Sequence, residues 1–129
     1  MRLPESRPVE PRSLSSQERS WIREILETNP RWADVDLNAP QVVAECDCGK
    51  CRTVFLRSVS PQNPSLAGTK GWVGRIEIMT ADDFMITIAL DQHDGKLSGL
   101  YVDALDLRQP GDRQFPDEWS EKEHIVTRM

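Results

Sequence analysis

The sequence predicts an α+β fold: an antiparallel sheet of about five strands with one or two N-terminal helices packed on one face. Apolar residues with helical spacing form a stripe from Trp21 to Leu26. Apolar and polar residues alternate with period two over Trp72 to Thr80 and over Phe84 to Leu90. Turn residues separate these runs at short intervals, so consecutive strands are expected to pair as hairpins.

At 129 residues the chain has the length of one domain and shows no internal repeat. Residues 1–13 carry three prolines among charges, a composition that predicts a mobile arm. The domain is expected over residues 14–120. Residues 121–129 are expected to form a C-terminal tail, preceded by the anchors Phe115 and Trp119.

A helix is expected to begin at Ser15, because Ser15 to Glu18 matches a capping box. The stripe from Trp21 to Leu26 would pack on the sheet. Asn29-Pro30 would end the helix, since proline disfavours the α region in the residue before it. The acidic segment from Arg31 to Pro40 fits either one helical turn or an irregular loop.

Gln41 to Ser58 contains all three cysteines and predicts two short strands that fold back about Gly49. The polar stretch from Ser60 to Gly71 predicts a long loop. In the strand that follows, alternation places Trp72, Gly74, Ile76 and Ile78 on one face.

The strand from Phe84 to Leu90 shows the strongest alternation in the chain. Its successor, Leu97 to Leu107, has apolar residues on both faces, which indicates a bulge or partial burial of each face. Between them, Asp94-Gly95 is the residue pair of a tight hairpin turn.

The composition excludes several classes of partner. A formal net charge of −5 and a pI near 5.0 disfavour nucleic acid, whose binders depend on clustered Lys and Arg, and favour a basic protein surface. No apolar run approaches the ~20 residues of a membrane helix, so no membrane partner is expected. The charged, proline-containing N-terminus lacks the apolar stretch of an export signal, which predicts a cytoplasmic location.

Cys46, Cys48 and Cys51 form C-x-C-G-x-C, and thiolates at this spacing can converge on zinc. A structural zinc site needs a fourth ligand, and the chain has only two histidines, His93 and His124. The alternative is that the cysteines are small apolar residues on a strand, with no cofactor. Redox chemistry is disfavoured because strand residues, not a helix, follow Cys51.

The sequence shows no nucleophile and base motif, so no catalytic residue is predicted. Carboxylates gather at hairpin ends and along one strand, where most are typical turn formers or solvated residues. We expect these carboxylates to form a partner-binding surface, with Trp72 as a candidate anchor; the alternative for Trp72, at the start of a strand, is a place in the core. The expected surface comprises Trp72, Asp82, Asp83, Asp91, Asp94, Asp103 and Asp106.

The run V-x-x-C-x-C-G-x-C-x-T-V, preceded by S-x-x-E-R-x-W-I-x-x-I-L and followed by D-G-K-L-S-G-L, resembles a group of small bacterial proteins of unknown function. That group carries an N-terminal helix, a C-x-C-G-C-x-T-V hairpin and a closing D-G-x-L-x-x-L hairpin. The resemblance covers Leu14 to Leu107, with Lys50 as a departure that alters the turn. The size and acidity of its members also resemble those of immunity proteins from bacterial toxin systems.

The leading hypothesis is therefore a cytoplasmic binding protein, most specifically an immunity protein that occludes the basic cleft of a toxin domain. Acidic side chains accelerate such an encounter. The alternative is a small zinc-binding or enzymatic domain that uses Cys46, Cys48 and Cys51.

Overall fold

The structure is a computed structural model, and it describes residues 6–32, 35–48, 51–108, 116 and 119–128. Within these residues the chain forms strands, one α-helix and two short 3-10 helices. In chain order they are β1 (Ser6–Ser13), α1 (Ser16–Glu27), η1 (Pro30–Trp32), β2 (Gln41–Cys46), β3 (Val54–Arg57), η2 (Pro64–Leu66), β4 (Lys70–Thr80), β5 (Phe84–His93), β6 (Lys96–Asp106) and β7 (Glu121–Arg128).

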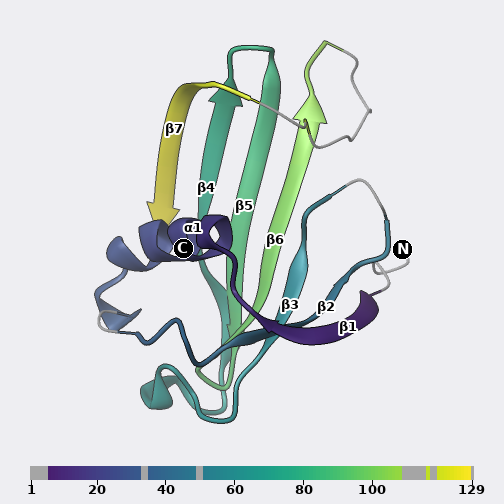
Figure 1. The fold of residues 1–129 in the computed structure, drawn as a ribbon. Helices are drawn as coiled ribbons and strands as arrows, with labels where there is room; N and C mark the ends of the chain where they lie inside the picture. Colours follow the sequence, from purple (N-terminus) through teal and green to yellow (C-terminus); the bar gives the residue numbers. More distant parts are fainter. Residues whose placement is uncertain (1–5, 33–34, 49–50, 109–115, 117–118, 129) are drawn as a thin grey trace.

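All strands belong to one sheet in the order β1-β2-β3-β6-β5-β4-β7, and every neighbouring pair is antiparallel (Figure 1). The predicted antiparallel sheet with a helix on one face is confirmed. The predicted number of strands is wrong: the described residues form seven, not about five. The two additional strands, β1 and β7, are the edges of the sheet.

Both edges lie where the sequence predicted an arm and a tail. Residues 6–13 pair with β2, and residues 121–128 pair with β4. Pro8 and Pro11 fit in β1 because an edge strand forms ladder hydrogen bonds on one side only, and the register shifts between Pro8 and Arg12. Trp119 packs against the core, whereas Phe115 lies outside the described residues.

α1 begins as predicted. The Glu18 N–H donates to Ser15 Oγ at 3.1 Å, and the Ser15 N–H donates to Glu18 Oε1 at 2.7 Å, which completes the capping box. The helix packs against β4, β5 and β7 through its buried apolar stripe (Figure 1). After it, η1 forms the single helical turn that was one of two alternatives for this segment. No helix in the described part of the chain is long and apolar enough to cross a membrane.

The core lies between α1 and the central strands. Ile86, Ile88 and Leu90 of β5 are fully buried, while Thr87 and Ala89 on the other face are half-buried. The neighbouring strands supply further inward side chains: Ile76, Ile78, Leu100 and Val102. Asp94 (φ 57°) and Gly95 (φ 77°) both have positive φ, which confirms the predicted hairpin turn between β5 and β6.

Trp72 does not share a face with Ile76, contrary to the prediction. The pairing of β4 with β5 shifts register between Trp72 and Gly74. This bulge turns Val73 inward, where it is buried, and leaves Trp72 50% exposed on the face away from α1. A bulge inserts one residue into the alternation, so counting by twos from Ile76 gives the wrong face.

Candidate functional site

The three cysteines lie together where β2 leads into β3. Their Sγ atoms all lie within 4.8 Å of one another. The Sγ atoms of Cys48 and Cys51 are 3.1 Å apart, and the Cys51 N–H donates to Cys48 Sγ at 3.3 Å. The Cys46 N–H donates to the Thr53 carbonyl at 3.1 Å, so strand pairing holds the two arms of the thiol cluster side by side. Gly49, the predicted centre of the turn, lies outside the described residues.

The thiol of Cys46 is protonated at neutral pH in the absence of a cation. Burial raises its pKa to about 11; the Cys48 backbone N–H acts in the opposite direction, and hydrogen bonds with the Cys48 and Cys51 side chains add to the rise. A bound metal ion would reverse this balance, since a coordinating thiol loses its proton.

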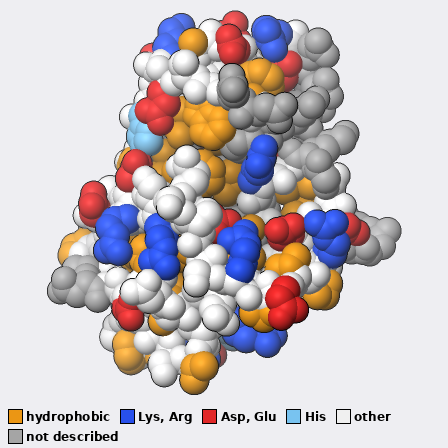
Figure 2. Space-filling model, in the orientation of Figure 1, with side chains coloured by type: hydrophobic (Ala, Val, Ile, Leu, Met, Phe, Trp, Pro, Cys, Tyr) orange, Lys and Arg blue, Asp and Glu red, His pale blue; other side chains and the backbone are white. Residues whose placement is uncertain are grey.

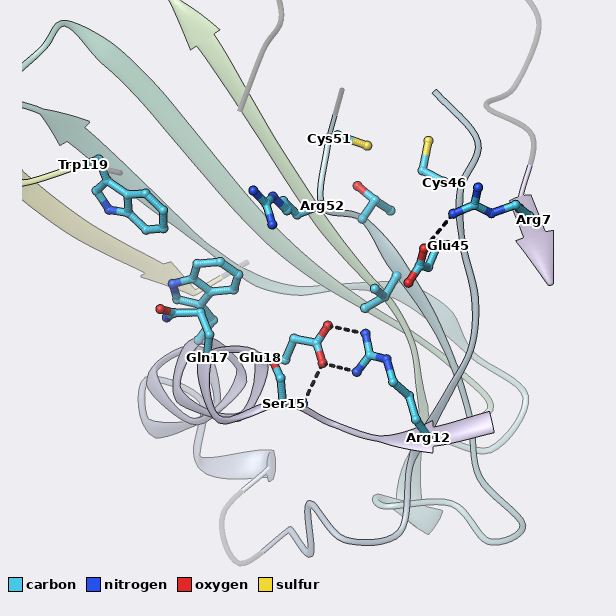
Figure 3. A pocket seen from close by; sticks show the side chains of 13 residues that line it. Arg7, Arg12, Ser15, Gln17, Glu18, Glu45, Cys46, Cys51, Arg52 and Trp119 are labelled. Carbon is cyan, nitrogen blue, oxygen red and sulfur yellow. Dashed lines mark hydrogen bonds and ion pairs between the residues drawn. The ribbon is translucent and has the colours of Figure 1, made fainter. Parts of the chain in front are cut away.

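A pocket of about 550 Å³ lies beside the thiol cluster, and Cys46 and Cys51 form part of its wall (Figure 3). The other walls come from β1, from the N-terminal turn of α1 and from Trp119. Arg52 extends from the side of Cys51 toward Trp119 (Figure 3). The pocket therefore combines sulfur ligands with guanidinium groups, carboxylates and an indole ring.

Ion pairs fix two of the arginines in this pocket. Arg12 forms two hydrogen bonds with Glu18, at 2.9 and 3.1 Å, and Arg7 lies 3.0 Å from the Glu45 carboxylate. Burial alone would raise the pKa of Glu18, but the hydrogen bonds from Arg12 and Ser15 lower it below its usual value. Figure 2 shows Lys and Arg side chains in a row across this face of the molecule, over α1 and β1, with acidic side chains among them.

Neither histidine completes a four-ligand zinc site. His93 lies 3.6 Å from Asp94, and His124 contacts Glu24 at 2.7 Å and Glu121 at 3.2 Å. Among the described residues, the three thiols are the only group of side chains arranged to hold a metal ion. The donor set fits zinc in number and chemistry for three of four positions, with the fourth left to a water or another ligand.

The acidic residues of the expected partner surface lie at both ends of the sheet. Asp82 and Asp83 are exposed in the turn between β4 and β5, and Asp106 lies opposite Phe84 nearby. Asp103 lies farther along β6, opposite Thr87. Asp91 and Asp94 lie at the other end of β5.

Several of these acidic side chains have structural partners: Asp91 accepts hydrogen bonds from the Ser98 and Tyr101 hydroxyls, and Asp103 accepts one from the Ala104 N–H. Asp94 accepts a hydrogen bond from the Gly68 N–H, and Asp106 pairs with Arg108. Of the expected surface, Trp72 and Asp91 are direct neighbours across two strands.

The pocket and the arrangement around Trp72 were not predicted from the sequence. Arg7 and Arg12 reach the pocket because residues 6–13 form a strand. Tyr101 lies beside Trp72, and Phe55 lies beside Tyr101, through pairings between strands distant in the chain. Period-two alternation predicts that Phe55 and Tyr101 face away from α1, but it does not predict that they meet.

The described residues thus form an antiparallel sheet covered on one face by one α-helix, with a cluster of three thiols at the end of a hairpin. Comparisons with protein-family models, curated proteins and solved structures found no match to the chain.

Proposed function

We propose that the protein binds a zinc-class metal ion through Cys46, Cys48 and Cys51. The observation that supports the proposal is the convergence of three Sγ atoms within 4.8 Å. Tetrahedral coordination with zinc–sulfur bonds of about 2.3 Å sets neighbouring sulfurs roughly 3.8 Å apart. The observed distances between Sγ atoms, from 3.1 Å to at most 4.8 Å, lie on both sides of this value. Small side-chain rotations would therefore place the three sulfurs around a zinc ion. The Cys51 N–H that points at Cys48 Sγ would also stabilise a thiolate there.

The metal ion would fasten the end of the β2–β3 hairpin and would not build the core. The buried apolar residues form one cluster between α1 and the sheet, and none of the three cysteines belongs to it. The fourth coordination position is the chemically open one, because three protein ligands leave room for a water or an added ligand.

Elemental analysis of protein purified without chelator tests the proposal. We expect one zinc per chain, and replacement by Co²⁺ should give thiolate-to-cobalt charge-transfer absorption. A triple variant, Cys46→Ser, Cys48→Ser and Cys51→Ser, should lose both signals and stay folded, with a stability loss of about 1–3 kcal/mol. Val59→Ser, at a side chain that is 97% exposed, is the control and should retain both.

Two results would contradict the proposal. Absence of metal together with absence of cobalt absorption would show that the thiols are not a ligand set. Unfolding of the triple variant, together with unfolding of the wild type by a chelator, would show that the metal is needed for the fold itself.

As a second function we propose protein binding, most specifically occlusion of a bacterial toxin domain by an immunity protein. It is supported by the net charge of −5 and by the exposed Trp72 on a sheet face that no described α-helix covers. A pull-down from the source organism, followed by binding kinetics with the purified partner, tests it. A basic partner whose toxic activity is blocked at one-to-one stoichiometry would support it. An acidic partner would contradict the electrostatic basis.

A further inference from the structure

Trp72 and Asp91 lie side by side because of the bulge in β4. Their Cα atoms are direct partners across β4 and β5, and Asp91 is in turn the partner of Gly99 on β6. A second register shift, between Asp91 and Gln92, lies at the same level of the sheet. Bulges re-aim side chains, and here two of them present an indole and a carboxylate on the face away from α1.

Neighbouring groups hold the Asp91 carboxylate in place. Its Oδ1 accepts a hydrogen bond from Ser98 Oγ at 2.7 Å, and its Oδ2 accepts one from Tyr101 Oη at 3.1 Å. Burial, and then the charge of Asp91, raise the pKa of Tyr101 to about 12, so this hydroxyl keeps its proton and remains the donor. Each carboxylate oxygen retains a second acceptor position for a ligand.

The indole of Trp72 is equally constrained. Its ring lies edge-to-face with Tyr101, with centroids 5.3 Å apart and an interplanar angle of 71°. Tyr101 itself lies over Gly99, where an added Cβ would come within 2.7 Å of the ring. The ring centroids of Tyr101 and Phe55 are 6.0 Å apart, in an edge-to-face arrangement. The aromatic rings and the carboxylate therefore form a preorganised unit, which lowers the entropy lost on binding.

A separate pocket of about 430 Å³ opens beside this pair. Trp72, Asp91, Gln92 and Ser98 line it, together with Lys70 and His93. The Gln92 side chain is already engaged with Thr69 and with the Gly95 N–H. Asp91 and the face of Trp72 are thus the groups left to recognise a ligand, and an anion next to an aromatic face suits a cation.

We propose that Trp72 and Asp91 bind the guanidinium group of an arginine side chain from a partner protein. A guanidinium is planar, stacks on an indole and donates two parallel hydrogen bonds to a carboxylate, whereas an ammonium does not combine these contacts. Lys70 and His93 limit the negative charge of the pocket, so it takes a single cation and not a run of basic residues. The net charge of −5 favours the approach of a basic partner.

This site does not involve the thiol cluster. It rests on the proposed protein-binding role only for the source of the arginine. A small-molecule probe therefore tests the site by itself: its failure removes the arginine site, whereas failure to find a basic partner removes the binding role.

The experiment is a titration of ¹⁵N-labelled protein with argininamide, monitored by NMR through the backbone amides and the tryptophan indole N–H signals. Citrullinamide, a neutral analogue of the same shape, is the matched titrant. We expect saturating shifts at the Trp72 indole and at residues of the pocket, with citrullinamide at least about tenfold weaker because charge-assisted hydrogen bonds are the strong ones. The chain has four tryptophans, so a Trp72→Leu variant assigns the signal.

Matched variants locate the effect. Asp91→Asn should weaken argininamide binding about tenfold, whereas Glu123→Gln removes an exposed charge on β7, opposite Met79, and should leave binding unchanged. Circular dichroism and melting temperature verify that each variant is folded, and Trp72→Phe, which keeps a ring, provides a milder second change. Equal shifts from both titrants, absence of shifts at Trp72, or equal losses from Asp91→Asn and Glu123→Gln would overturn the proposal.

Discussion

Glu18 shows how one side chain can serve both the helix and the pocket. It caps α1 through the Ser15 N–H, accepts two hydrogen bonds from Arg12, and has a side chain only 10% exposed. Removing its charge leaves one amide oxygen to serve both the Ser15 N–H and Arg12, in place of two carboxylate oxygens, so the charge-assisted pair of hydrogen bonds from Arg12 is lost.

Glu18→Gln should destabilise the protein at pH 7 by about 1 kcal/mol, because hydrogen bonds to a charged acceptor are replaced by weaker ones to a neutral amide. The folded-state pKa of Glu18 is lowered below its usual value of 4.5. Its contribution is therefore fully present above 4.5 and is lost as pH falls through the folded-state pKa. Urea denaturation from pH 7 down to about pH 3 should show wild type and variant converging.

Glu27→Gln, at the exposed end of the same helix, is the control and should show a much smaller change at pH 7. A constant difference between wild type and Glu18→Gln across the whole pH range would mean that the charge of Glu18 is not what matters.

At the scale of single elements, β5 is the most regular strand. Ile86 and Ile88 have no exposed surface and lie in the core cluster with Trp21 and Ile25. Either isoleucine changed to alanine should lower the free energy of unfolding by about 2–5 kcal/mol, through lost transfer energy and the cavity left behind. Thr87→Ala, on the opposite face, should change it by less than about 1 kcal/mol. Chemical denaturation measures all three, and equal losses would mean that both faces are covered.

β7 is fastened to α1 through His124, which lies between Glu24 and Glu121. Burial alone lowers the pKa of His124, but the hydrogen bonds and charges of the two glutamates raise it above its usual 6.5. A raised folded-state pKa contributes stability that is complete below 6.5 and is lost as pH rises through the folded value.

His124→Gln should therefore be less stable than wild type at pH 6, and the difference should shrink toward about pH 8. Melting temperatures across this range measure the effect, and hydrogen exchange of the β7 amides reports it locally. His93→Gln, at an exposed histidine in the β5–β6 turn, is the matched control. A difference that grows with pH would contradict the assignment.

The central elements could be predicted from the sequence because their signals are local. A capping box, a helical stripe and period-two alternation depend on neighbours within a few positions. β1 and β7 could not be predicted, because their pairing partners are distant in the chain. The prolines and charges of β1 and the charges of β7 also fit an unpaired segment. The bulge at Trp72 was missed for a similar reason: it depends on how β4 meets β5.

The candidate sites divide in the same way. The three thiols lie within six positions, so a turn alone brings them together and their spacing predicts it. The pocket beside them draws on Arg7, Arg12 and Trp119, from three segments that only the complete sheet assembles. The pairing of Trp72 with Asp91 likewise depends on strand register, which a sequence pattern does not fix at a bulge.

For the whole molecule, charge sets the expected kinetics of the proposed protein binding. Asp82 and Asp83 are exposed in one turn, between β4 and β5. Replacing Asp82 by Lys and Asp83 by Asn should slow association with a basic partner while leaving the melting temperature almost unchanged. Asparagine is chosen at position 83 because φ there is 64° and asparagine tolerates this conformation.

Association of the wild type should also slow steeply as salt rises to physiological ionic strength, where the Debye length is about 8 Å. Stopped-flow or surface-based kinetics across a salt series measures both effects. An association rate indifferent to salt and to the charge change would leave hydrophobic docking as the driving force.

Proline and charge protect both outer edges of the sheet. An unpaired strand edge is a template for another chain, and β1 carries Pro8 and Pro11 while β7 begins Glu121-Lys122-Glu123. β4, directly behind β7, has no proline and carries the apolar pair Ile76 and Ile78. Proteolysis that released β7 would therefore leave the hydrogen-bonding groups of β4 unpaired along a long edge. Such an edge can pair with the same strand of another molecule and start the growth of a fibril.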